Sequence, residues 1–127
     1  MIPLVEQAIR LSPRQPNIGY RYFQIGEVNL LQSHIDEAIA WLEKARSAIP
    51  AVPNFRSFLS SAYALGGDIQ RAAVELAEAR RLDGGVLFSS ITALKSGRHW
   101  VWGSPKTRAL YEATYFAGLR KAGMPDK

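Results

Sequence analysis

The sequence repeats itself with a period of 34 residues. Residues 19–52 can be written above residues 53–86 without a gap, and the residue types then agree at many positions. The matched pairs are Ile25 and Leu59, Gly26 and Ser60, Asn29 and Tyr63, Ile35 and Ile69, Ala38 and Ala72, Leu42 and Leu76, Ala45 and Ala79, and Pro50 and Gly84. A fixed period of this length is typical of stacked helical hairpins, which usually bind other proteins. The repeat therefore predicts an all-α chain.

Each repeat is expected to form two helices joined by a short turn, because its apolar residues recur at spacings of three and four. The pattern predicts helices over residues 16–31, 35–50, 54–65 and 69–83. Pro50 and Pro53 end the second helix because proline lacks the backbone donor. In the second turn, Gly66 and Gly67 tolerate left-handed backbone, and Asp68 can cap the next helix.

Small residues explain why the period is fixed. Gly26 and Ser60 are expected where the first helix of each hairpin meets the second, and a larger side chain there would hold the axes apart. In the second helices, Ala38 and Ala72 are expected to allow the same close approach within a hairpin. Ala45 and Ala79 are expected to allow close packing of the next hairpin.

These positions resemble the tetratricopeptide repeat family. The first unit matches the family pattern at Tyr22, Ile25, Gly26, Ala38, Leu42, Ala45 and Pro50, and the second at Leu59, Tyr63, Ala72, Leu76 and Ala79. The sequence departs from the pattern at Asn29, which replaces the usual Tyr, and at Arg56, Ser60 and Gly84. The resemblance implies an α-α superhelix, a right-handed solenoid of about seven helices.

In this family the concave surface is lined by the first helices and binds a partner. The matching positions here are Tyr20, Phe23, Glu27, Leu30, Asn54, Ser57, Ser61, Phe88, Ile91 and Lys95. Members that grip a peptide carboxylate use Lys and Asn at several of these positions, whereas this chain has Phe23 and Glu27 at two of them. The resemblance thus implies an apolar peptide or helix anchored by Tyr20 and Phe23. Alternatively, these two residues contact upstream helices or a second copy.

The single domain expected over residues 1–127 has two atypical ends. Residues 1–13 resemble the second helix of a truncated repeat, so we expect a fragment of a longer protein, or a second copy over the exposed face. Residues 87–127 are expected to form a degenerate capping hairpin, with helices over 86–94 and 105–122. The loop between these helices contains Trp100 and Trp102, which we expect either to fill the core at this end or to anchor a partner. The last helix carries a partial apolar stripe: Leu110, Ala113, Thr114, Ala117 and Leu119 or Lys121.

The closing segment carries a second resemblance. Tyr111-Glu112 and residues 118–125 look like the C-terminal tetratricopeptide segment of bacterial proteins with an upstream class III adenylate cyclase domain. Similar segments follow DNA-binding regulator domains. The resemblance implies a regulatory or sensory module, to which none of the cyclase's catalytic residues carries over.

Charge and composition narrow the function classes. The net charge is +5, and the excess lies in residues 51–127, which hold eleven Lys and Arg against six Asp and Glu. The chain has no cysteine and starts with no secretory signal, so we expect a cytoplasmic protein without a membrane span. His34 and His99 lack companions at metal-ligand spacing, and we expect no metal, no cofactor and no catalytic residues.

The function expected from these observations is a non-enzymatic protein–protein interaction module, with a protein or peptide as partner. One alternative is a homo-oligomerisation unit that uses the exposed N-terminal helix face. A further alternative is a nucleic-acid-associated regulator that uses the basic C-terminal end.

Overall fold

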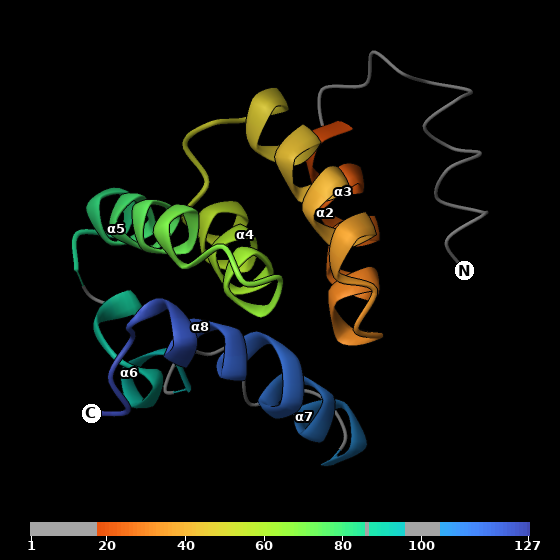
Figure 1. Ribbon diagram of the computed structural model, residues 1–127. Coiled ribbons are helices and arrows are strands. Elements are labelled where there is room, and N and C mark those ends of the chain that lie inside the picture. The colour runs from red at the N-terminus through yellow and green to blue at the C-terminus, as the bar shows by residue number, and fades with distance from the viewer. Residues whose placement is uncertain (1–17, 86, 96–104) are drawn as a thin grey trace.

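The computed structural model describes residues 18–85, 87–95 and 105–127 (Figure 1). The regular elements of these ranges are all helical, so the predicted all-α class is confirmed. They are α2 (Ile18–Leu31), α3 (Ile35–Ala48), α4 (Pro53–Leu65), α5 (Ile69–Asp83), a 3₁₀ turn (Leu87–Ser89), α6 (Ile91–Lys95), α7 (Pro105–Tyr111), a π-helical turn (Glu112–Phe116) and α8 (Ala117–Ala122). The helix expected over residues 1–13 lies outside the described residues.

Helices α2 and α3 form one packed pair and α4 and α5 form a second. The two pairs have equivalent turns. The His34 N–H donates to the Asn29 carbonyl at 2.8 Å, and 34 residues later the Asp68 N–H donates to the Tyr63 carbonyl at 2.8 Å. Gly67 has a φ of 92°, the left-handed conformation that glycine adopts without strain. The predicted cap is confirmed, because the Asp68 side chain accepts the Arg71 N–H at 3.1 Å.

The small residues of the repeat lie between the paired helices, as predicted. A Cβ atom added to Gly26 would stand 2.7 Å from Cγ of Leu42. At the equivalent place in the second pair, the Ser60 hydroxyl donates to the Ala72 carbonyl at 2.7 Å. The four alanines of the pattern are completely buried: Ala38, Ala45, Ala72 and Ala79.

A buried carboxylate joins the first helix pair to the second. Glu75 on α5 is 5% exposed, and its two oxygens lie 2.8 Å from Nη1 of Arg46 on α3 and 3.1 Å from Nη1 of Arg56 on α4. Arg56 also donates to the Pro50 carbonyl between the pairs. This network fixes the place of α3 against α4 and α5.

The helix expected over residues 86–94 is corrected by the structure. Residues 87–89 form a 3₁₀ turn, and α6 begins only at Ile91. The reason is local, because the Ser90 hydroxyl accepts the Ala93 N–H and so caps a new helix after the turn. The N–H groups of Ile91 and Thr92 donate to the carbonyls of residues 125 and 126, which ties α6 to the end of the chain.

The final helix has the predicted bounds but presents a different face to the core. Leu110 is 43% exposed and Ala113 is exposed as well, so these two members of the expected stripe are wrong. Thr114 is buried, and of the two alternatives Leu119 and Lys121 it is Leu119 that is buried. The buried face also includes Tyr111, Tyr115, Phe116, Gly118 and Ala122. The large aromatic rings bury more apolar area than Leu110 would, and the π-helical turn changes the helical phase between α7 and α8.

Helix α4 lies at the centre of the arrangement, packed against α3, α5 and α8 (Figure 1). The contact with α8 is very close, since a Cβ atom on Gly118 would lie 2.5 Å from the Ser61 carbonyl oxygen. The Ser61 hydroxyl donates to the Tyr115 carbonyl at 2.8 Å. The C-terminal helix thus packs directly on α4. No helix in the described ranges has the length and apolarity needed to cross a bilayer.

Candidate functional site

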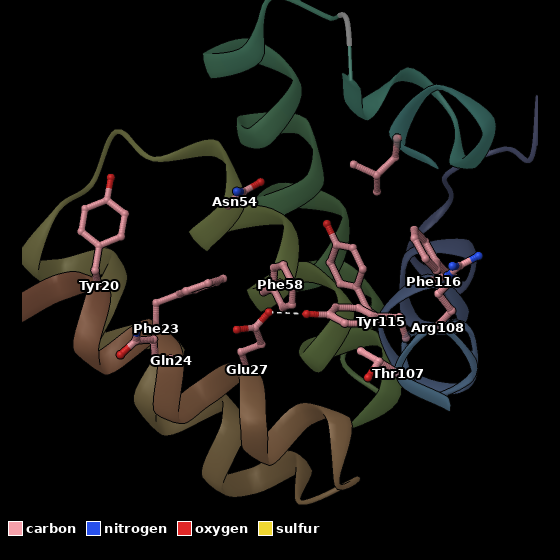
Figure 2. A pocket seen from close by; sticks show the side chains of 12 residues that line it. Tyr20, Phe23, Gln24, Glu27, Asn54, Phe58, Thr107, Arg108, Tyr115 and Phe116 are labelled. Carbon is pink, nitrogen blue, oxygen red and sulfur yellow. Dashed lines mark hydrogen bonds between the residues drawn. The ribbon is translucent and has the colours of Figure 1, made fainter. Parts of the chain in front are cut away.

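A pocket of about 360 Å³ lies among α2, α4, the end of α6 and the C-terminal helix (Figure 2). We call it the aromatic pocket, because most of its lining area is apolar and much of it comes from rings. Its lining residues are Tyr20, Phe23, Gln24, Glu27, Asn54, Phe58, Leu94, Thr107, Arg108, Tyr111, Tyr115 and Phe116. A concave, largely apolar site of this size with a few polar groups is typical of ligand sites.

Ring contacts join the three helices that form the walls. Phe23 on α2 meets Phe58 on α4 edge-on, with ring centroids 4.9 Å apart. Phe58 in turn stacks on Tyr115 of the π-helical turn, with centroids 4.0 Å apart and planes 17° from parallel. Aromatic pairs at these distances stabilise their arrangement beyond simple burial. The walls are therefore held in place before any ligand binds.

The main acidic group of the pocket is Glu27. Its carboxylate accepts a hydrogen bond from the Tyr111 hydroxyl at 2.5 Å. Burial raises the pKa of Glu27, because desolvation disfavours the charged form, and the hydrogen bond from Tyr111 offsets part of this rise. The carboxylate forms no ion pair with any of the residues that the structure describes.

The two tyrosines of the C-terminal helix are buried phenols with different partners. Burial raises the pKa of Tyr111, and the neighbouring Glu27 raises it further. Burial also raises the pKa of Tyr115, whose hydroxyl lies 2.8 Å from that of Ser57. Both phenols therefore stay protonated near neutral pH, and Tyr111 remains a hydrogen-bond donor to the acid.

Four of the ten residues expected at a partner site line the aromatic pocket. Tyr20 and Asn54 are exposed, and Phe23 and Glu27 are half-buried. A fifth residue, Lys95, lies at the end of α6, where its Nζ is 2.9 Å from both oxygens of Glu112.

The other five expected residues are buried inside the described structure: Leu30, Ser57, Ser61, Phe88 and Ile91. The reason for the two serines is that the chain's own C-terminal helix covers this face of α4. Ser57 contacts the Tyr115 hydroxyl, and Ser61 donates to the Tyr115 carbonyl. Phe88 and Ile91 belong to the core that the 3₁₀ turn and α6 build.

The sequence pattern does not predict the other lining residues, most of which belong to the C-terminal helix: Gln24, Phe58, Leu94, Thr107, Arg108, Tyr111, Tyr115 and Phe116. The available signal was the spacing of Tyr111 and Tyr115, four residues apart, which places two rings on one helical face. Trp100 and Trp102, and the N-terminal face expected to mediate oligomerisation, lie outside the described residues.

The basic C-terminal end is partly neutralised. Glu112 pairs with both Lys95 and Arg120, and Arg120 also pairs with Asp126 at 2.8 Å. Within the described ranges, no group of three or more His, Asp or Glu side chains is placed to hold a metal ion.

No protein-family model matches the chain, and no curated protein is significantly similar to it.

Proposed function

We propose that this chain is a non-enzymatic interaction module that binds a peptide segment of another protein in the aromatic pocket. The observation that carries the proposal is the convergence of Phe23, Phe58 and Tyr115, from three different helices, on one concave surface. Aromatic rings dominate the binding energy of protein interfaces because they bury large areas with few rotatable bonds.

We further propose that the two helix pairs are tetratricopeptide-like units of a right-handed superhelix. Support comes from the equivalent turns 34 residues apart and from the small residues between the paired helices. In such a stack the first helices line the inner surface, and Phe23 on α2 and Phe58 on α4 both belong to first helices. The sequence of the closing segment favours a regulatory C-terminal region of a bacterial signalling protein as the context.

The test is a selection of binders from a random-peptide library on the whole chain. Peptides enriched on the wild type should bind at least ~10-fold more weakly to Phe23→Ala and to Tyr20→Ala, since each substitution removes a ring from the wall. Tyr20 is 49% exposed, so its replacement keeps the fold testable if Phe23→Ala proves unstable. Val74→Ala is the matched control, because Val74 on α5 is 66% exposed and lies outside the pocket.

Enrichment of peptides that depend on Phe23 or Tyr20 but not on Val74 would support the proposal. Enrichment that all three variants leave unchanged would place the binding surface elsewhere, and no enrichment at all would refute a peptide-binding pocket.

A further inference from the structure

The aromatic pocket holds an acid, Glu27, that forms no ion pair with the residues the structure describes. Glu27 is half-buried on α2, and Oε2 of its carboxylate accepts the Tyr111 hydroxyl. No cation of the described residues pairs with it, although Arg108 on α7 lines the same pocket. An ionised carboxylate among rings is costly unless a cation or further donors compensate it.

The walls around this acid have the chemistry that attracts a cation on an apolar stem. A Lys or Arg head group is attracted to the face of an aromatic ring within about 6 Å. The methylenes of the same side chain can pack on apolar surface while the head group stays with the acid. Phe23, Phe58 and Tyr115 contribute rings to the lining of the pocket, and Glu27 contributes the acid (Figure 2).

We propose that the aromatic pocket takes a Lys or Arg side chain of the bound peptide, with its ammonium or guanidinium group on the Glu27 carboxylate. This inference rests on the proposed function and names the chemistry of the ligand. An ionised acidic side chain of a peptide is disfavoured at the same position, because two carboxylates at hydrogen-bond distance repel each other. The Tyr111 hydroxyl donates to Oε2 of the Glu27 carboxylate and so orients it.

The pKa of Glu27 gives this site a signature. A bound cation stabilises the ionised carboxylate, so binding lowers a pKa that burial has raised. The affinity for a cation should therefore fall as the pH drops through the pKa of Glu27, whereas the affinity for a neutral ligand should not. The other polar groups of the pocket include the phenols of Tyr111 and Tyr115, which stay protonated, the uncharged amide of Gln24 on α2 and the guanidinium group of Arg108 on α7.

The first test uses n-hexylammonium as probe and hexan-1-ol as its neutral match, in NMR titrations of the isotopically labelled whole chain. Hexylammonium should bind the wild type at least ~10-fold more tightly than hexanol and should perturb the amides around Glu27 and Tyr111. Glu27→Gln should bring the two affinities together. Asp36→Asn removes an exposed acid of α3 outside the pocket and should leave the ratio unchanged.

The inference would be overturned if the wild type bound hexylammonium and hexanol with nearly equal affinity. It would also be overturned if a folded Glu27→Gln variant kept the wild-type ratio of these two affinities. The second test replaces the basic residue of a library-selected peptide by norleucine. This replacement should weaken binding of the peptide to the wild type at least ~10-fold, but it should not weaken binding to Glu27→Gln. Selected peptides without any Lys or Arg would also overturn it while leaving the peptide-binding function intact. Preferential binding of hexylammonium without any selected peptide would instead retain the cation site and refute the proposed function.

Discussion

Replacement of Gly118 by alanine should destabilise the fold, although alanine is the better helix former. At an open position in a helix the change from glycine to alanine stabilises by up to about 1 kcal/mol. At Gly118 the new Cβ atom would stand 2.1 Å from the Ser61 hydroxyl oxygen, 2.5 Å from its carbonyl oxygen and 2.8 Å from its Cα atom. Two of these atoms are backbone and cannot rotate away, so α8 must move off α4.

The magnitude follows from the two opposing effects. Overpacking at a tight contact costs about 1–3 kcal/mol, and the backbone contact puts Gly118 at the upper end. After the gain in helix propensity, a net loss of about 2 kcal/mol remains. For a chain of 127 residues the unfolding entropy converts this loss into a fall in Tm of about 7 °C.

The assay is thermal unfolding followed by circular dichroism, with Gly26→Ala measured in parallel. A Cβ atom on Gly26 meets mainly the Leu42 side chain, at 2.7 and 2.8 Å, which can shift more easily than backbone. Gly118→Ala should therefore lower the Tm more than Gly26→Ala does. An unchanged or higher Tm for Gly118→Ala would refute the close packing of α8 on α4.

Two further predictions concern buried acids. Glu75→Gln removes the charge that Arg46 and Arg56 share and should lower the free energy of unfolding by about 2–3 kcal/mol in denaturant titrations. Glu78→Gln, which removes a half-buried acid of α5 paired with the exposed Arg81, should change it far less, and equal effects would contradict the network. Burial raises the pKa of Glu27, so the folded state binds the proton of this acid more tightly than the unfolded state does. The stability that this group contributes therefore falls as the pH rises from about 4.5 through the raised pKa. The Tm of Glu27→Gln relative to the wild type should therefore increase with pH across this window, and a constant difference between pH 4 and pH 8 would contradict a buried acid.

The helix pairs could be predicted from the sequence because each depends on local signals. Gly66, Gly67 and Asp68 specify one turn through backbone conformation and capping, and the small residues at a period of 34 mark where the paired helices meet. These signals act over distances of a few turns of helix. The structure bears out both the turn and the burial of the small residues.

The site could be predicted only in part because it depends on how separate elements pack. On α2, Phe23 and Glu27 are expected at a partner site because the resemblance to tetratricopeptide repeats implies that first helices line the concave surface. Another part of the pocket comes from the C-terminal helix, whose phase is set by the π-helical turn and whose approach is set by Gly118 against Ser61. No periodicity in the sequence indicates that Ser57 and Ser61 would be covered by Tyr115 rather than by a partner.

The most direct measurement is a set of NOEs between the rings of Phe23, Phe58 and Tyr115 in the whole chain. Both the fold and the proposed site depend on these side chains meeting from α2, α4 and the C-terminal helix. Centroid distances of 4.9 and 4.0 Å predict strong ring-to-ring NOEs from Phe58 to each of the other two residues. The absence of NOEs between Phe58 and Tyr115 in the folded chain would contradict the account.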